Sequence, residues 1–119
     1  MSVTIKSRTV SDVLILDVAG KFDIGEESLR QSVKTFLAEG RQHFLLSLVD
    51  VPYLGSWGIT EIISAWKAIR SNRGTMGLLA PAKTARAVLQ FTKLDTVFAI
   101  YKNETEALQH FASHLAFDS

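Results

Sequence analysis

The fold is decided by one stretch, residues 44–69, which reads FLLSLVDVPYLGSWGITEIISAWKAI. Its first six residues are an almost continuous apolar run of strand length, which is typical of a strand covered on both faces. Further along, apolar residues recur at the spacing of one helical face: Ile59, Ile62, Ile63, Trp66 and Ile69. The stretch therefore predicts a buried strand, a loop over residues 50–58, and an amphipathic helix over residues 57–71.

Strands and helices alternate on both sides of this stretch. Three more apolar runs of strand length occupy residues 13–18, 76–80 and 97–101. Near the start, Val3 and Ile5 alternate with polar residues, as in a half-buried edge strand. The polar residues that follow, 7–12, indicate a turn into the next strand.

Helical periodicity marks three further segments, residues 29–37, 83–92 and 108–115. Gly40 is placed to end the first of them, and Asn103 with Glu106 forms a capping-box-like start for the last. The expected order is therefore ββαβαβαβα. It predicts an α/β fold with a mixed, mostly parallel five-stranded sheet and four helices, in one domain over residues 1–119.

Composition limits the functions that this chain can have. It has 119 residues, 47% of them apolar and 21% charged, which is typical of one globular domain. A net charge of +1 provides no strong field for binding nucleic acid. There is no cysteine, and the longest aliphatic run, Val13–Leu16, is far too short to span a membrane. We expect a cytoplasmic protein without disulfides, without nucleic-acid binding and without direct membrane insertion.

No motif in the chain indicates catalysis or a metal. Walker, GxGxxG and GxSxG motifs are absent from the sequence. His110 and His114 lie one helical turn apart, but no glutamate completes an HExxH motif, and His43 is far away in the sequence. We therefore expect no cofactor, no metal site and no enzymatic activity.

Three loops should meet at one edge of the sheet, because parallel strands bring their carboxyl ends together there. They are residues 19–25, 50–58 and 80–84. The second is the most informative, because Ser56 stands where a helix N-cap is expected and two glycines flank the Ser-Trp pair. Two readings stay open. Ser56 caps the helix while Tyr53, Leu54 and Trp57 cover the core, or the loop presents Ser56 and an aromatic side chain to a partner.

These residues resemble a known family. Residues 49–59 resemble the segment of STAS domains, found in bacterial anti-sigma factor antagonists, that usually reads Asp-Ser-Ser/Thr-Gly-Leu/Ile. Residues 20–23 are similar to the family's Gly-x-Leu/Phe-Asp turn. Residues 87–98 and 104–108 are similar to its last segments, the second being its Glu-x-Glu-Ala-Leu. The resemblance covers nearly the whole chain in the right order.

The resemblance implies a protein-binding switch that regulates transcription. In the family, an anti-sigma factor that is also a serine kinase of the ATPase type phosphorylates the serine after the Asp, and the phosphorylated antagonist releases its partner. Carried onto this chain, the phosphoacceptor is Ser56. The implied partner-binding residues lie in the three loops and at the start of the helix: Asp23, Gly25, Tyr53, Leu54, Gly55, Trp57, Gly58, Ile59 and Lys83.

Two positions depart from the family pattern. Gly55 stands where the family has Asp, and Trp57 stands where a second Ser or Thr is usual. These departures favour an alternative function, a STAS accessory subunit that docks constitutively in a transport or signalling assembly without phosphorylation. A small-molecule or nucleotide site among the loops is a third hypothesis. A hydrolase is the least favoured, because no histidine is placed to activate Ser56.

Overall fold

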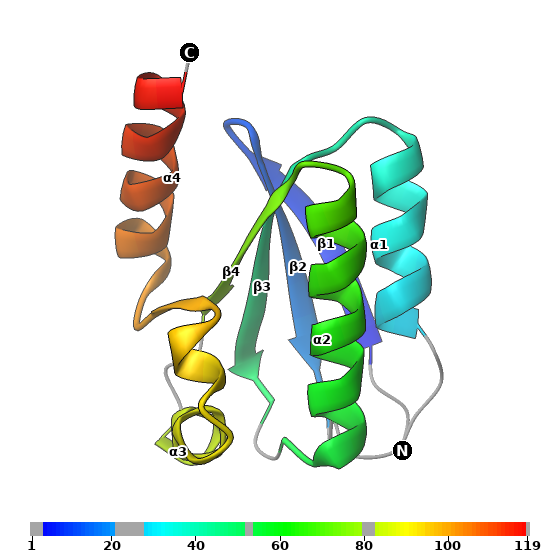
Figure 1. Ribbon diagram of the computed structural model, residues 1–119, viewed down its shortest axis with the longest axis vertical. Helices are drawn as coiled ribbons and strands as arrows, with labels where there is room; N and C mark the ends of the chain where they lie inside the picture. Colours follow the sequence, from blue (N-terminus) through cyan, green and yellow to red (C-terminus); the bar gives the residue numbers. More distant parts are fainter. Residues whose placement is uncertain (1–3, 21–27, 52–53, 80–82, 119) are drawn as a thin grey trace.

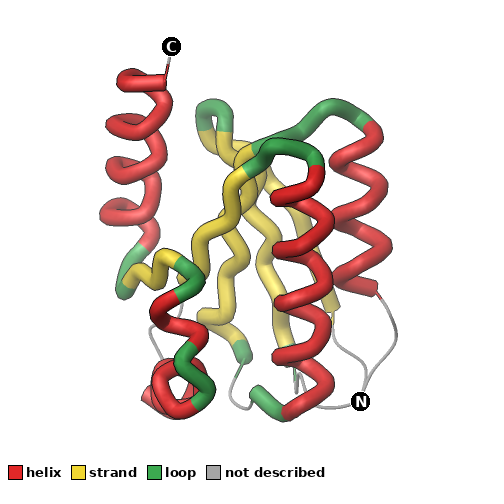
Figure 2. The backbone as a smooth tube through the Cα atoms, in the orientation of Figure 1, coloured by secondary structure: helices red, strands yellow, loops and turns green. Residues whose placement is uncertain are grey.

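The computed structural model describes residues 4–20, 28–51, 54–79 and 83–118. Two antiparallel strands, β1 (Thr4–Val10) and β2 (Val13–Ala19), open the chain. The other strands are β3 (His43–Asp50), β4 (Thr75–Leu79) and β5 (Ala99–Tyr101), and β2 to β5 run parallel to one another. The sheet has the order β1-β2-β3-β4-β5 and lies at the centre of the molecule (Figure 2). The predicted mixed, mostly parallel sheet is confirmed.

Four α-helices connect and cover the strands, as predicted. They are α1 (Ser28–Ala38), α2 (Ser56–Ser71), α3 (Lys83–Phe91) and α4 (Glu104–Asp118), and a 3-10 turn, η1 (Leu94–Thr96), follows α3. Gly40 ends α1 with a positive φ of 90°, and the amide of Arg41 donates to the carbonyl of Phe36 at 3.0 Å. The expected glycine cap is therefore present.

The two faces of the sheet carry separate apolar layers. The larger layer joins the strands to α1, α2 and α3, with Leu29, Ile62 and Leu89 at 1% exposure or less. The smaller layer lies on the other face, where Ala107 and Phe111 of α4 pack with strand residues. Figure 1 shows α1 and α2 side by side and α4 apart from them. Each parallel strand is thus covered on both faces, which explains the continuous apolar runs.

Two strands differ from their predicted bounds by more than one residue. β1 extends to Val10, and only Ser11 and Asp12 form the turn, with a positive φ of 54° at Ser11. The polar residues of β1 belong to an edge strand whose outer side faces solvent, so their polarity did not end the strand. β5 starts at Ala99 rather than at Val97. The preceding Phe98 is buried, and its ring makes a T-shaped contact with Trp66 at 5.6 Å, which places it in the core before the strand begins.

No helix in the part of the chain that the structure describes is long and apolar enough to cross a membrane.

Candidate functional site

The edge at which the parallel strands end gathers the candidate residues. β2 ends at Ala19, β3 at Asp50 and β4 at Leu79, and α2 begins at this same edge, the lower one in Figure 1. The amide of Gly20 donates to the carbonyl of Asp50 at 3.2 Å, so the ends of β2 and β3 are tied together. The convergence of loops at one edge is confirmed for the described residues.

The chain approaches α2 through buried apolar residues. Val51 and Leu54 belong to the larger apolar layer, and Leu54 is only 3% exposed. The amide of Val51 also donates to the carbonyl of Leu48 at 3.1 Å, which turns the chain immediately after β3. Leu54 thus covers the core, and the expectation that its side chain contacts a partner is not met in this structure. Burial of Leu54 instead fixes where α2 begins.

Ser56 is the first residue of α2 and not its N-cap, which corrects the expectation from the sequence. The N-cap is Gly55, which has an extended backbone (φ −94°, ψ −175°) and no side chain that could accept a hydrogen bond. No other side chain among the described residues caps the helix. The carbonyl of Gly55 accepts from the amide of Ile59 at 3.1 Å, which is the first bond of the helix. The amides before Ile59 therefore have no acceptor inside the helix.

Ser56 is an exposed residue at this helix end. Ser56 is exposed, whereas Gly55 and Gly58 on either side are buried. The Thr60 hydroxyl donates to the backbone carbonyl of Ser56 at 3.0 Å, so this hydrogen bond does not use the Ser56 side chain. Amides without an acceptor inside the helix, together with the helix dipole, favour an anion at this position. A group added to the serine oxygen would meet both.

Trp57 and Ile59 lie half-buried in the first turn of α2. Ile59 packs against the larger apolar layer. The indole Nε1 of Trp57 is buried and has no hydrogen-bond partner among the described residues. A buried N–H without an acceptor is costly, so this position of the ring does not arise from a hydrogen bond of Nε1 to a described residue.

Lys83 is exposed at the start of α3, directly after the third loop of the edge. The remaining predicted contact residues, Asp23, Gly25 and Tyr53, lie outside the described residues. The structure thus brings Ser56, Gly55, Trp57, Gly58, Ile59 and Lys83 to one edge of the sheet, while Leu54 lies beneath it in the core.

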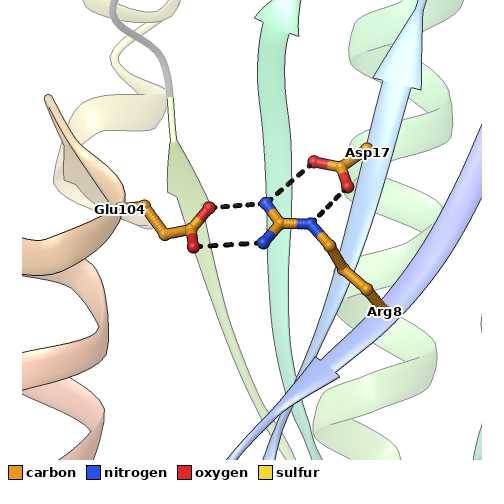
Figure 3. A network of polar contacts seen from close by, with 3 residues as sticks. All are labelled: Arg8, Asp17 and Glu104. Carbon is orange, nitrogen blue, oxygen red and sulfur yellow. Dashed lines mark hydrogen bonds and ion pairs between the residues drawn. The ribbon is translucent and has the colours of Figure 1, made fainter.

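Sequence reasoning missed a network of three charged side chains on the other side of the molecule. Arg8 of β1 donates from Nε to Oδ2 of Asp17 at 2.6 Å and from Nη1 to Oε2 of Glu104 at 3.1 Å (Figure 3). Asp17 is on β2 and Glu104 begins α4, so the guanidinium ties the hairpin to the last helix. The hydrogen bond from Arg8 lowers the pKa of the Glu104 carboxyl, and the two carboxylates raise the pKa of Arg8.

Sequence reasoning also missed a buried carboxylate in α2. Glu61 is 2% exposed, and its Oε1 has no hydrogen-bond partner among the described residues. Glu61 lies outside the apolar stripe of α2, where a charged residue is expected to face solvent, so no sequence signal indicated its burial. In the part of the chain that the structure describes, no three His, Cys, Asp or Glu side chains cluster as a metal site would require.

Comparisons with known proteins agree with this architecture. The STAS domain family model matches residues 4–107. A candidate anti-sigma factor antagonist of Thermotoga neapolitana is 31% identical over 104 residues, which cover 86% of this chain and 92% of the relative. The crystal structure of an anti-sigma factor antagonist from Mycobacterium paratuberculosis has a TM-score of 0.81 at 23% identity and covers 91% of this chain and 92% of its own.

A second solved structure has the same fold with a modified chain. It is the Bacillus cell fate determinant SpoIIAA in its phosphorylated form, with a TM-score of 0.69 at 18% identity, covering 91% of this chain and 99% of its own. The order of elements, the mixed sheet and the family match over most of the sequence all agree. The chain belongs to the STAS domain family.

Proposed function

We propose that this chain is an anti-sigma factor antagonist, a cytoplasmic regulator of transcription that acts as one STAS domain over residues 1–119. It binds an anti-sigma factor through the sheet edge that carries Ser56. Phosphorylation of Ser56 by a serine kinase of the ATPase type, which is the anti-sigma factor itself, ends this binding. Its family membership and its relatives named as anti-sigma factor antagonists support the proposal. The antagonists of this family are regulatory binding proteins, and we propose no catalytic activity for this chain.

The observation that carries the proposal is the exposure of Ser56, the first residue of a helix that no described side chain caps. A phosphate on this oxygen adds about −1.5 to −2 charges at neutral pH. The positive end of α2 and its first amides, which have no acceptor inside the helix, stabilise that charge, so the domain stays folded. The same charge in a partner interface must be desolvated or meets a carboxylate, so the complex weakens.

The proposed contact surface combines the first turn of α2 with its neighbours. Trp57 and Ile59 supply partly exposed apolar area beside Ser56, and Lys83 supplies a positive charge at the start of α3. Gly55 and Gly58 contribute backbone and no side chain. Asp23, Gly25 and Tyr53 remain proposed contacts from the loops outside the described residues. We leave Leu54 out of the contact surface, because its side chain is buried.

The test is to identify both the partner and the modified residue. Wild-type, Ser56→Ala and Ser56→Asp proteins are used side by side for affinity capture from native lysate, and captured proteins are identified by mass spectrometry. We expect wild type and Ser56→Ala to retain an ATPase-type anti-sigma kinase that Ser56→Asp does not. With ATP and Mg²⁺, this kinase should add one phosphate to wild type and none to Ser56→Ala. A phosphate mapped to any other residue would refute the assignment.

A second function is favoured by one specific observation. The family's Asp is replaced by Gly55, so no carboxylate stands beside the serine for a kinase to recognise, and Trp57 adds a large ring next to it. These features suit a STAS accessory subunit of a transporter or signalling scaffold that docks constitutively. In that case Ser56→Asp should capture the same protein as wild type, with unchanged yield. The two functions therefore give opposite results with this variant.

A further inference from the structure

One face of α3 carries two positively charged side chains, the exposed Lys83 and the half-buried Arg86, which form no ion pair with the described residues. Lys83, Arg86, Ala87 and Gln90 are spaced as neighbours on one side of the helix, and they line a surface hollow of about 290 Å³. The opposite side of the helix is fixed by burial, with Ala85 at 1% exposure and Leu89 at 0%. The orientation of α3 therefore directs the cationic side toward solvent. We call the residues Lys83, Arg86, Ala87, Gln90 and Phe91 the α3 face.

The two cations of the α3 face form no ion pair with the described residues. The ion pairs among the described residues belong to Arg8, and neither Lys83 nor Arg86 takes part in one. The Nε of Arg86 is buried and lacks a hydrogen-bond partner among the described residues. Lys83 also stands in the first turn of α3, which has no acidic residue. A cation there opposes the helix dipole, so its presence does not serve the stability of the helix.

An exposed aromatic side chain continues the same face. Phe91 is the last residue of α3, one residue after Gln90 and one turn after Ala87, and it is 90% exposed. Most phenylalanines in folded domains are buried, and an aromatic residue beside basic ones is the composition of a protein-binding anchor. The α3 face thus joins an exposed lysine and a half-buried arginine to one exposed aromatic ring.

We propose that the α3 face binds an acidic segment of a partner protein, with carboxylates paired to Lys83 and Arg86 and an apolar side chain covering Phe91. This deepens the proposed function and rests on it only for the partner's identity, since α3 begins at the same sheet edge as Ser56. Charge complementarity selects an acidic occupant. Two cations on a chain of net charge +1 are too few to hold a nucleic-acid backbone.

The test uses a defined probe and the whole chain. A short synthetic peptide that alternates glutamates with leucine and phenylalanine is titrated into ¹⁵N-labelled protein, and amide shifts are followed by NMR. The comparison probes are the same peptide with lysine in place of glutamate, and a single-stranded oligonucleotide. We expect saturable shifts confined mainly to residues 83–91 for the acidic peptide, and a fall in affinity of about tenfold or more when the ionic strength is raised tenfold.

Matched variants separate the α3 face from a general charge effect. The double substitution Lys83→Glu with Arg86→Glu should lower the affinity for the acidic peptide by about tenfold or more. Lys34→Glu with Lys67→Glu makes the same charge change at exposed positions of α1 and α2 and should change affinity by less than about twofold. Phe91→Ser should weaken binding several-fold while keeping the salt dependence. Dispersed amide spectra for each variant show that it is folded.

Three results would overturn the inference: no saturable shift on α3 at millimolar peptide, equal weakening by the two double variants, or stronger α3 shifts with the oligonucleotide. The peptide experiment does not involve Ser56 or a kinase. If capture finds no anti-sigma kinase while the acidic peptide binds α3, the proposed function is wrong and the α3 face stands. If the kinase is captured but the peptide causes no amide shifts on α3, the proposed function stands and the inference about the α3 face is wrong.

Discussion

Helices α2 and α4 begin in opposite ways. α4 follows Asn103, whose side-chain oxygen accepts from the amide of Glu106 at 2.8 Å, and its first turn carries Glu104 and Glu106. α2 follows Gly55, which offers no side chain, and its first turn has no acidic residue. The start of α4 is thus held by polar contacts, whereas the start of α2 is held by the burial of Leu54 and Val51 before it.

The two helix starts differ in whether the positive end of the helix is already satisfied or can still bind an anion. At α4, the cap, the acidic first turn and the pair with Arg8 satisfy the positive end of the helix. At α2, no described side chain caps the positive end of the helix, so this end can bind an anion. An uncapped start next to an exposed serine is unfavourable for stability alone, and it suits a helix whose anion arrives as a phosphate. Four principal substitutions, each with a second variant for comparison, test this contrast.

The largest effect is expected at the apolar anchor of α2. Leu54→Ala should lower the free energy of unfolding by about 3 kcal/mol, because it leaves a cavity in the larger apolar layer. Leu54→Met keeps most of the volume and should cost less than about 1.5 kcal/mol. Both values come from urea unfolding followed by circular dichroism. A loss below about 1 kcal/mol for Leu54→Ala would mean that Leu54 does not anchor the helix start.

Removing the cap of α4 should have an intermediate effect. Asn103→Ala takes away the acceptor of the Glu106 amide, and we expect a loss of about 1 kcal/mol in the same unfolding measurement. Asn103→Ser is the matched control, because a serine hydroxyl can accept the same bond and should retain most of the stability. If both variants were equally destabilised, the cap would not account for the loss.

A smaller, pH-dependent effect is expected from the Arg8 network. The pKa of Glu104 is lowered by its hydrogen bond with Arg8, so the folded state favours the ionised carboxylate. This contribution is complete above the ordinary pKa of 4.5 and is lost as pH falls through the lowered pKa. Because the side chains of Arg8 and Glu104 are 42% and 36% exposed, we expect Glu104→Gln to cost less than about 1 kcal/mol at pH 7.

The stability gap between wild type and Glu104→Gln should then narrow as the pH is lowered below the pKa of the folded carboxyl. Unfolding in urea at a series of pH values from neutral to strongly acidic measures this gap. Arg8→Met serves as a second variant, since it removes the pair with Glu104 from the other side, together with the pair with Asp17. A gap that stays constant over the whole series would show that the Glu104 carboxylate does not gain from Arg8.

The smallest effect is expected when α2 is given the cap that it lacks. Gly55→Asp places a carboxylate at an N-cap whose extended backbone already suits it, and should raise stability by about 0.5 kcal/mol. Gly55→Asn adds the capping hydrogen bond without the charge, so the difference in stability between the two variants gives the contribution of the charge at the helix end. The same Gly55→Asp protein should be a better kinase substrate if the family's carboxylate guides recognition, which phosphate incorporation per minute would show. A decrease in stability would contradict the open N-terminus.

Sequence patterns could predict the elements that depend on apolar residues. The runs around Ile15, Leu46 and Leu78 predicted buried strands because parallel strands covered on both faces leave few polar positions. The helical stripe through Ile62 and Ile69 predicted α2 to within one residue at its start. The Asn103 cap followed from a local pattern, and one of its bonds is present.

Features that depend on distant contacts could not be predicted in this way. Arg8 and Glu104 are 96 residues apart in the chain, and nothing local marks them as partners. Ser56 was predicted as the N-cap because serine favours that position, but burial of Leu54 sets the start one residue earlier, so that glycine takes the cap. Burial of Glu61 depends on what packs over α2, which one sequence does not show.

One measurement tests the central claim most directly. Isothermal titration calorimetry compares the affinity of the purified anti-sigma kinase for unmodified protein and for protein carrying phosphoserine at position 56, with circular dichroism to confirm that both are folded. We predict that the phosphate weakens binding by about 100-fold or more while the melting temperature changes by only a few degrees. Equal affinity of the two folded forms would contradict the account.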